Sequence, residues 1–347
     1  MGSLVLKAVS LQLNLREDSS AEEVLGNLSR GLAAARAGGA GLALLPAFTG
    51  LLFLLSEGER LSFDPTRRGV SFGPSLKILL GEKGRTGEAS FLESMAALAR
   101  QNSLFLGAGT LPVFRDGKMY HRAYLFSPEG KLVGTQDQTH TTPWERSWGL
   151  ARGEGVEVWP TEIGRLALLA GSDIWYPEVS RILALLGAEV VLAPVTMPPP
   201  YGLWQQLAGL WQEVQQNQFL ALESGLSGRL LGQELVGRSA VFAPCEMTAG
   251  ETGFLGLAAS QWEETWRELT RVYPAALEGL PISLRESASG GKGSGYPEVE
   301  VVSADLDLPG REAVVQAYPL LKLLNPSLYR RYLPGIYGKG DVRREGR

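Results

Sequence analysis

The sequence predicts an α/β fold in which helices cover the faces of a sheet. The first evidence is residues 5–13, whose apolar and polar side chains alternate as in a half-buried strand. Residues 20–37 follow with apolar side chains at helical spacing. Residues 42–45 then form a short apolar run, typical of a strand buried on both faces. Strand and helix patterns alternate again over residues 90–109 and 166–194, and such alternation is typical of sheets covered by helices.

Both ends of the first helix are marked by their residue types. Ser19 or Ser20 can cap the N-terminus, and Glu22 and Glu23 suit the positive end of the helix dipole. The Gly-Gly pair at 38–39 ends the helix, because glycine adopts the backbone conformations that follow a last turn.

Composition bounds the class of protein. At 347 residues, with 44% hydrophobic and 20% charged residues, the chain can bury a large core as one or two domains. No apolar run reaches the ~20 residues that a membrane-spanning helix requires, and we identify no signal peptide. A net charge of -4 gives no electrostatic case for nucleic acid. The single cysteine, Cys245, excludes a disulfide within the chain and suits a reducing cytoplasm, where we expect the protein to act.

The stretch 166–188 carries the most specific motif. An apolar strand ends in the turn Gly171-Ser172-Asp173, and Tyr176-Pro177-Glu178 then opens an amphipathic helix. This layout resembles the nucleophile elbow of the nitrilase, or carbon–nitrogen hydrolase, superfamily, in which a strand ends in Cys-x-Asp followed by an aromatic residue, Pro and Glu. In that register Gly171 stands where the family has its catalytic Cys.

Two further segments resemble the other catalytic blocks of the family. In residues 39–50 an apolar strand ends at a proline, and Ala47 occupies the position of the general base Glu. In residues 130–145 the pattern Gly-Lys-φ-φ-Gly leads to His, Pro and Glu145, and Gln138 stands where the family has its Lys. All three members of the Glu–Lys–Cys triad are therefore replaced.

The resemblance extends along almost the whole chain, over residues 5–15, 27–40, 90–109, 211–228, 237–244 and 301–332. It implies the four-layer α-β-β-α sandwich of the family, built by one domain over residues 3–335, with a basic C-terminal tail at 336–347. In the segment that resembles the Arg-Ala-x-Glu-Asn helix of the family, Asn217 is kept, while Glu213 and Gln216 replace the Arg and Glu.

The replaced triad sets the expectation for function. In the family a thiolate attacks a nitrile or amide carbon, Glu moves the proton and Lys stabilises the oxyanion. Gly171 offers no side-chain atom, Ala47 no proton acceptor, and Gln138 a neutral amide in place of a charge. The resemblance therefore implies a pseudoenzyme that acts as a scaffold, or as a subunit that binds a small ligand or a protein partner. The alternative is a carbon–nitrogen hydrolase that acts on nitrile or amide bonds with an unconventional site.

Five side chains remain in the pocket that the resemblance implies: Gln138, Glu145, Ser172, Asp173 and Trp175. They could bind a small polar molecule. We expect the Ser172 side chain to point away from the position of the lost nucleophile, Cys245 to fill apolar space, and His140 to be a hydrogen-bonded core residue. His121 and His140 are the only histidines, and no spacing suits a metal ligand set, so we expect neither a metal nor a cofactor.

The resemblance also implies assembly. In the family, the helix after the elbow and the Arg-Ala-x-Glu-Asn helix pair across a two-fold axis and extend the sandwich to eight layers, α-β-β-α-α-β-β-α. The matching segments here, residues 177–186 and 201–222, hold more apolar surface than one polar-faced helix needs. We expect a homodimer or larger homo-oligomer through five residues: Ile182, Leu185, Leu186, Trp204 and Trp211.

Two stretches depart from this compact frame. Residues 51–88 are rich in Gly and Pro and lie where the family keeps a lid, so we expect a loop there. Residues 250–300 include an amphipathic segment at 260–274 and a Gly/Ser-rich stretch that is a linker by composition. The apolar face of the amphipathic segment fits either the core of the chain itself or a protein partner.

Overall fold

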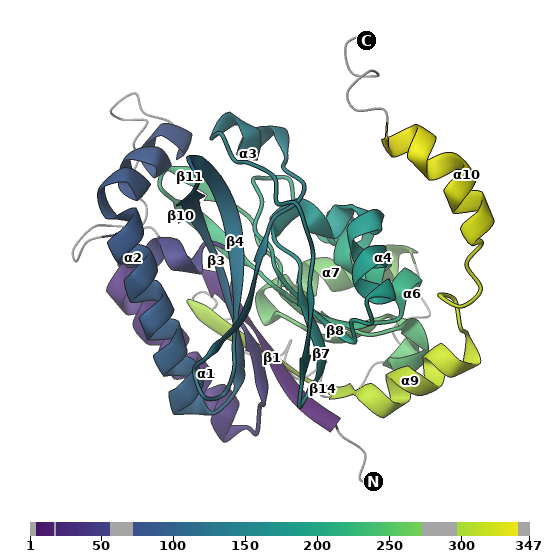
Figure 1. Cartoon of the computed structure of the whole chain (residues 1–347). Helices are drawn as coiled ribbons and strands as arrows, with labels where there is room; N and C mark the ends of the chain where they lie inside the picture. The colour runs from purple at the N-terminus through teal and green to yellow at the C-terminus, as the bar shows by residue number, and fades with distance from the viewer. Residues whose placement is uncertain (1–4, 17–18, 56–71, 273–296, 339–347) are drawn as a thin grey trace.

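The computed structural model describes residues 5–16, 19–55, 72–272 and 297–338, which form two sheets packed face to face between outer helices (Figure 1). The layers follow the order helix, sheet, sheet, helix. The prediction of a four-layer α-β-β-α sandwich is therefore confirmed.

The first sheet contains eight strands of the described chain in the order β11-β10-β1-β2-β3-β4-β5, with β14 paired to β1. The strands are β1 (Val5–Asn14), β2 (Leu42–Leu44), β3 (Phe105–Arg115), β4 (Lys118–Phe126), β5 (Leu132–Asp137), β10 (Leu226–Leu230), β11 (Gln233–Leu235) and β14 (Val299–Asp307). Strand β1 runs parallel to β2 and antiparallel to β14, so the N-terminal and C-terminal parts of the described chain share one sheet.

The second sheet has six described strands in the order β13-β12-β9-β8-β7-β6. They are β6 (Val158–Thr161), β7 (Gly164–Leu168), β8 (Val190–Pro194), β9 (Leu220–Ser224), β12 (Ala240–Phe242) and β13 (Phe254–Leu257). The central strands β7, β8 and β9 are parallel to one another, so their carboxyl ends lie at the same edge of the sheet.

Helices form the two outer layers. On the outer face of the first sheet lie α1 (Ala21–Ala37) and α2 (Phe72–Asn102), and on that of the second lie α4 (Pro177–Leu185) and α6 (Gln212–Asn217) (Figure 1). The remaining helices are α3 (Pro143–Ser147), α5 (Leu203–Gln206), α7 (Ala259–Val272), α9 (Leu308–Ala317) and α10 (Pro326–Tyr337). None of the helices in the described ranges is long and apolar enough to cross a membrane.

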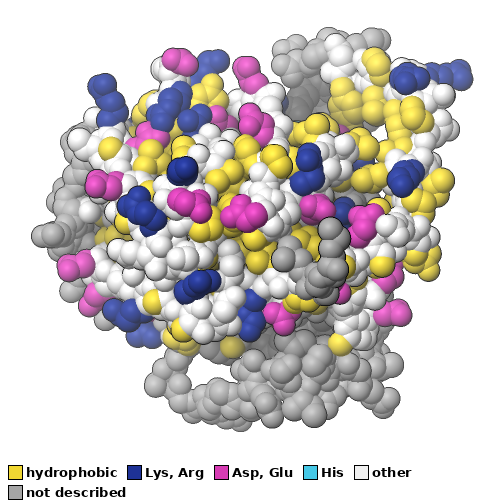
Figure 2. All heavy atoms as spheres, turned by 60° about the horizontal axis from the view of Figure 1, so that its bottom comes forward, with side chains coloured by type: hydrophobic (Ala, Val, Ile, Leu, Met, Phe, Trp, Pro, Cys, Tyr) yellow, Lys and Arg dark blue, Asp and Glu magenta, His cyan; other side chains and the backbone are white. Residues whose placement is uncertain are grey.

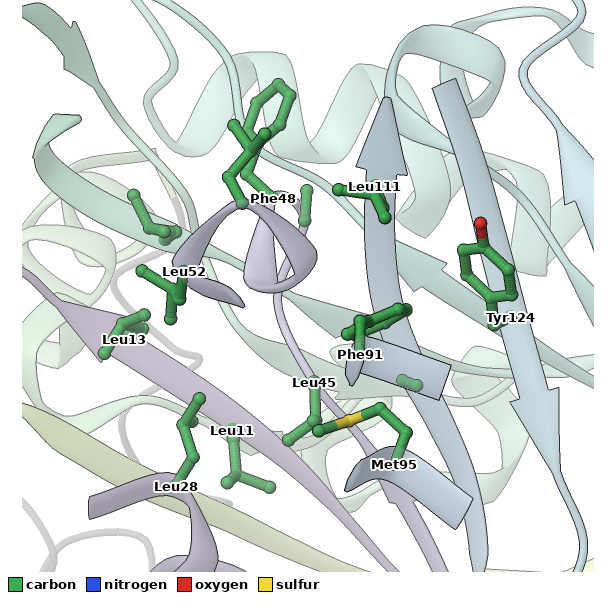
Figure 3. Packing of buried hydrophobic residues seen from close by; sticks show 14 of the residues in the cluster. Leu11, Leu13, Leu28, Leu45, Phe48, Leu52, Phe91, Met95, Leu111 and Tyr124 are labelled. Atoms are coloured by element: carbon green, nitrogen blue, oxygen red, sulfur yellow. The ribbon is translucent and has the colours of Figure 1, made fainter. Parts of the chain in front are cut away.

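Three buried apolar clusters fill the three gaps between the four layers. The largest lies between α1, α2 and the first sheet, where Leu28, Phe91 and Met95 meet Leu11 and Leu45 (Figure 3). The second lies between the two sheets, and the third lies between the second sheet and α4 and α6. Each layer is therefore held by the burial of apolar surface on at least one face.

The first helix and the short strand are confirmed. Helix α1 begins at Ala21, and Ser20 caps it by accepting a hydrogen bond from the backbone N–H of Glu23. All three residues of β2 are buried. The expectation of a half-buried strand over residues 5–13 is wrong, because β1 lies between the helical layer and the second sheet and both of its faces are covered from Ala8 to Leu13.

The expectation of a loop over residues 51–88 is wrong from residue 72 onward, where α2 begins. Residues 56–71 lie outside the described ranges. Two of the glycines that suggested a loop, Gly73 and Gly87, lie where the helix packs closely. A Cβ at Gly73 would lie 3.1 Å from the Cα of Trp148, and one at Gly87 would lie 2.0 Å from Leu54 Cδ2. Here glycine permits close packing rather than ending a helix.

The amphipathic segment at 260–274 is helical up to residue 272, within α7. The Trp262, Trp266 and Leu269 side chains of its apolar face, and the Gly/Ser-rich stretch, lie outside the described part of the chain. After β14 and α9, helix α10 stands apart from the two sheets (Figure 1). Its end is tied to the start of α4, because the Tyr337 hydroxyl donates to the Glu178 carboxylate.

Replacing Phe91 by Ala should lower the free energy of unfolding by about 3–5 kcal/mol. The ring is fully buried and meets the rings of Phe53 and Tyr124 edge-on, at centroid distances of 5.5 and 5.3 Å. Urea denaturation measures the loss. The control is Ile78→Ala on the same helix, where the side chain is 57% exposed and the change should stay within about 0.5 kcal/mol. Equal losses in the two variants would contradict the described packing of α2.

Candidate functional site

The candidate site lies where strands of both sheets end. Gln138 directly follows β5 of the first sheet. The turn Gly171-Ser172-Asp173 opens the 3-10 segment η3 (Gly171–Trp175), which follows β7 of the second sheet. The two segments meet at the seam between the sheets, where Gln138 contacts both Gly171 and Ser172.

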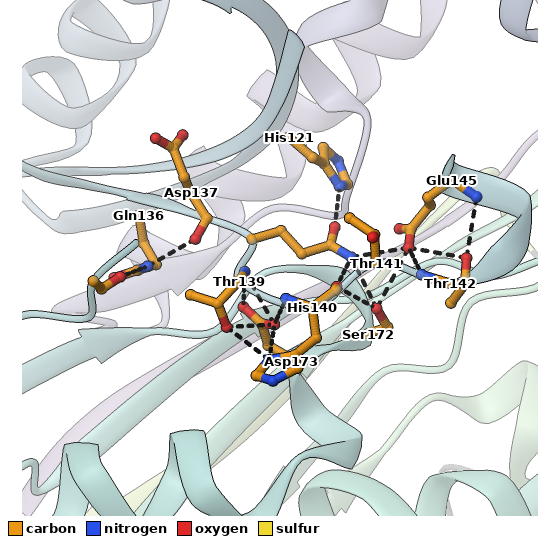
Figure 4. Close-up of polar contacts among 12 residues, drawn as sticks. His121, Gln136, Asp137, Thr139, His140, Thr141, Thr142, Glu145, Ser172 and Asp173 are labelled. Carbon is orange, nitrogen blue, oxygen red and sulfur yellow. Dashed lines mark hydrogen bonds and ion pairs between the residues drawn. The ribbon is translucent and has the colours of Figure 1, made fainter. Parts of the chain in front are cut away.

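The fully buried Gln138 carboxamide is the centre of a hydrogen-bond network. Its partners His121, Glu145 and Ser172 are labelled in Figure 4. Its Nε2 donates to Glu145 Oε2 at 2.9 Å and to Ser172 Oγ at 2.8 Å, and also lies 2.6 Å from the carbonyl of His140. Its Oε1 lies 2.8 Å from His121 Nδ1. Because a carboxylate only accepts hydrogen bonds, Glu145 fixes which end of the amide carries the hydrogens.

The network fixes the protonation of His121 as well. Gln138 Oε1 can only accept, so His121 Nδ1 donates to it and the ring Nε2 accepts from the Thr110 hydroxyl, 2.5 Å away. The Thr110 oxygen in turn accepts from the backbone N–H of Phe48 at 2.8 Å. Burial lowers the pKa of His121, which keeps the ring neutral. The neutral ring can therefore accept from Thr110 at Nε2 while it donates to Gln138 at Nδ1.

Neutral donors surround the Glu145 carboxylate. Glu145 is the third residue of α3 and forms a capping box with Thr142, whose backbone N–H and hydroxyl donate to Oε2 at 2.7 and 2.9 Å. With Gln138 Nε2, three donors lie within hydrogen-bond distance of the same oxygen. The carboxylate is buried and these donors all meet Oε2, so this oxygen is a structural acceptor in the arrangement.

Gly171 and Gln138 occupy complementary space. The φ angle of Gly171 is +55°, a left-handed conformation that a side chain disfavours. A Cβ built there would lie 2.6 Å from Gln138 Oε1 and 3.0 Å from Gln138 Cδ. The carboxamide therefore fills the space that a residue at position 171 would use for its side chain.

Asp173 holds the segment that follows Gln138. Its carboxylate accepts from the backbone N–H groups of Thr139 and His140, at 2.9 and 2.7 Å, and from the Thr139 hydroxyl. His140 is hydrogen-bonded to Thr139 Oγ1, and its ring stacks on Tyr176 at a centroid distance of 3.8 Å. The expectation of a core position for His140 is wrong, because the loop leaves about a third of its side chain exposed.

The structure brings only part of the expected pocket together. Gln138, Glu145 and Ser172 share one network, and Asp173 holds the backbone of Thr139 and His140, which directly follow Gln138. Ala47 is buried in the cluster beneath the first sheet, and the backbone N–H of its neighbour Phe48 donates to the Thr110 hydroxyl of the network.

Trp175 and Cys245 lie elsewhere. The indole N–H of Trp175 donates to the carbonyl of Gln205, and its ring meets Tyr201 at 5.9 Å. Cys245 is half-buried, and burial raises the pKa of its thiol. No group of His, Cys, Asp and Glu suited to a metal ion occurs among the described residues.

Two members of the site, His121 and Thr110, are not predicted from the sequence, where His121 is considered only as a metal ligand. His121 is buried like Met119 and Ala123, and these positions alternate with the part-exposed Tyr120 and Arg122 along β4, so the His121 side chain faces inward. Thr110 lies on β3, and the pairing of β3 with β4 brings its hydroxyl to the ring. The signal in the sequence is a lone polar residue on the buried face of a strand, which requires a hydrogen-bond partner.

A second buried polar cluster lies at the end of β9. The Glu223 carboxylate accepts from the Tyr201 hydroxyl and, at 2.7 Å, from Gln206 Nε2. Arg238 Nε donates to Gln206 Oε1 at 3.0 Å, so the arginine is separated from the carboxylate by an amide. Burial raises the pKa of Glu223 to about 7. The sequence does not single out this residue either, because it lies within an apolar run.

The raised pKa of Glu223 predicts a pH dependence of stability. Between an ordinary pKa of 4.5 and a folded value of about 7, the folded state holds the proton more tightly than the unfolded chain. Ionisation therefore destabilises the folded state progressively as pH rises through this window, by about 3 kcal/mol above pH 7.

Glu223→Gln should gain stability relative to the wild type from pH 4.5 to 7.5, measured by urea denaturation across that range. The exposed Glu234 of β11 supplies the control, Glu234→Gln, whose stability should follow the wild type at every pH. A constant difference between Glu223→Gln and the wild type would mean that Glu223 titrates normally.

The match to known proteins agrees with this architecture. The model of the carbon-nitrogen hydrolase family matches residues 7–249. A carbon-nitrogen hydrolase from Helicobacter pylori G27 superposes with a TM-score of 0.63 at 19% identity, covering 95% of this chain and 99% of that one. A mutant amidase from Nesterenkonia sp. AN1, solved with an acetamide moiety on its active-site cysteine, superposes with a TM-score of 0.60 at 17% identity, covering 94% and 96%.

A relative in Bacillus subtilis, the probable hydrolase YhcX, is 29% identical over 171 residues. That match covers 48% of this chain and 33% of the Bacillus protein, so this chain matches about a third of that relative's length. The family model covers well over half of the chain. The chain belongs to the carbon-nitrogen hydrolase family.

Proposed function

We propose that this protein keeps the carbon-nitrogen hydrolase fold without the chemistry of the family, and acts as a scaffold or as a subunit that binds a small ligand or a protein partner. The observation that carries the proposal is the contact between Gln138 and Gly171. A neutral amide stands at the position of the lysine, and it fills the space of the nucleophile's side chain.

Each missing group has a defined chemical role. The amidase from Nesterenkonia carries its acetamide moiety on an active-site cysteine, whereas Gly171 has no side-chain atom that can attack a carbon. Ala47 cannot take a proton, and the donors around Gln138 are neutral and already engaged. Removal of a complete serine-protease triad lowers kcat by about 10⁶-fold, and we expect a loss of that order for this set.

The competing function is hydrolysis of nitrile or amide bonds at an unconventional site. One observation favours it: Ser172 Oγ lies 3.4 Å from Glu145 Oε2, a pairing of hydroxyl and carboxylate. The shorter hydrogen bond from Ser172 goes to the carbonyl of His140 at 2.8 Å, however, and Glu145 is occupied by Thr142 and Gln138. A hydroxyl that donates to a carbonyl has no base to activate it.

Purified protein should therefore release no ammonia above background from nitriles, primary amides or N-carbamoyl compounds. The assay is run on the wild type, on Ser172→Ala and on Ser147→Ala, a matched control on the exposed side of α3. A rate that persists in Ser147→Ala and disappears in Ser172→Ala would establish the competing function and overturn the proposal.

The proposal includes assembly into a homodimer or larger homo-oligomer. The outer layer formed by α4 and the segment from Leu203 exposes four large apolar side chains: Ile182, Leu185, Leu186 and Trp204. Trp211 is half-buried, with its indole N–H bonded to the carbonyl of Thr252. Two copies joined through this layer would extend four layers to eight and remove that apolar surface from water.

Further exposed apolar side chains lie on α10, where hydrophobic and basic groups alternate at the right-hand margin of Figure 2. Since Tyr337 holds the end of α10 to the start of α4, a partner docked on α4 would also meet this helix. Leu328, Tyr332 and Leu333 are among its exposed apolar members.

Leu185→Glu should shift the protein toward the monomer at micromolar concentration, because a carboxylate would be buried without a partner in the paired layer. The Leu185 side chain is 58% exposed, so the substitution should leave the fold of the single chain intact. Ile78→Glu on the opposite outer layer, exposed to a similar degree, is the matched control. Sedimentation velocity measures the assembly. A wild-type monomer, or a dimer that Leu185→Glu leaves unchanged, would refute this interface.

A further inference from the structure

We propose that Gln138 is a resident ligand of the site: its side-chain carboxamide occupies the place that an external primary amide would take. The inference rests on the proposed function, since it gives the reason why the pocket is closed. It predicts that the site still recognises a small primary amide once the Gln138 side chain is removed.

Both ends of the carboxamide are held as a bound ligand would be. The NH₂ group faces three acceptors, Glu145 Oε2, Ser172 Oγ and the carbonyl of His140. The carbonyl oxygen faces one donor, His121 Nδ1. Acceptors at one end and a donor at the other select an uncharged primary amide in one orientation.

The carbon of the carboxamide is placed next to the elbow. Gln138 Cδ lies 3.0 Å from the position that a Cβ on Gly171 would take. The amide carbon therefore faces Gly171, which has a left-handed backbone. The carboxamide and a side chain at position 171 therefore exclude each other.

Other side chains of similar length do not suit position 138. Glutamate would place a second carboxylate against Glu145, and the two charges would repel. Lysine carries no acceptor for the hydrogen of His121 Nδ1. Methionine would leave the Glu145 carboxylate and His121 without their partner in a fully buried site. Among these side chains, only the carboxamide satisfies both ends of the network.

The side-chain fragment that Gln138→Ala removes determines which small molecule should be used as the probe. Gln138→Ala deletes a methylene carbon, the amide carbon, its oxygen and its nitrogen, and acetamide has the same set of heavy atoms. Thr110, His121, Glu145 and Ser172 remain in place around the vacated space. A polar cavity of matching shape binds the missing fragment, with the modest affinity typical of a very small ligand.

The experiment is a thermal-unfolding titration with acetamide in the high-millimolar range. Acetamide should raise the Tm of Gln138→Ala by at least about 2 °C relative to the wild type at the same concentration. Gln136→Ala is the matched control, since Gln136 is also buried and bonded, two residues earlier on β5, to the carbonyls of Asp137 and Gly155. It should show no greater rise than the wild type. Acetate should not stabilise Gln138→Ala, because its charge opposes Glu145.

Equal shifts in Gln138→Ala, Gln136→Ala and the wild type would overturn the inference, as would a folded Gln138→Ala that does not respond to acetamide. Turnover of amides by the wild type would refute the proposed function through a separate readout, leaving the titration interpretable. If Gln138→Ala does not fold, side-chain hydrogen exchange in the wild type decides. The Gln138 NH₂ protons should exchange at least about 100-fold more slowly than those of the exposed Gln101, and equal rates would overturn the inference.

Discussion

The apolar layer between the two sheets is the constraint on which the other features of this molecule depend. Two sheets packed face to face exclude water from the seam, so a polar group at that seam must find its partners within the protein. Ser10 and Gln12 on β1 meet this condition by bonding across to the second sheet, where Ser10 reaches the backbone of Glu223 and Gln12 accepts from Ser239 at 2.7 Å. The network around Gln138 meets the same condition at the edge of the seam.

Local pattern in the sequence was sufficient for the alternation of strands and helices, and the resemblance to the family added the order of the four layers. A short apolar run such as residues 42–44 and a helix capped by Ser20 are determined by neighbours along the chain. The partners of Gln138 were not predictable in the same way. His121 comes from β4 and Ser172 from the other sheet, and only the pairing of strands and the packing of sheets brings them to one amide. Gly73 and Gly87 of α2 suggested a loop for a similar reason, because their role is set by Trp148 and Leu54, which lie far away in the chain.

The buried carboxyls show that similar burial can serve different ends. Glu145 is held by a capping box and by an amide, and its position follows from the first turn of α3. Glu223 is held by a phenol and an amide, and Gln206 separates it from Arg238. Burial dominates over these hydrogen bonds and raises the pKa of Glu223. The two carboxylates therefore differ in the number and kind of donors around them.

The completed network around Gln138 also bears on how freely this chain can change over evolutionary time. An active site usually stores unfavourable energy, because it holds unsatisfied charges and strained residues ready for a substrate. Here the same location contributes hydrogen bonds to the folded state, so the scaffold gains tolerance toward mutations elsewhere. Under the proposed function, a return to catalysis would have to give up that gain at several positions at once, since a side chain at position 171 would meet the Gln138 carboxamide. Under the proposed function, this coupling makes the loss of the family's chemistry easier to keep than to reverse.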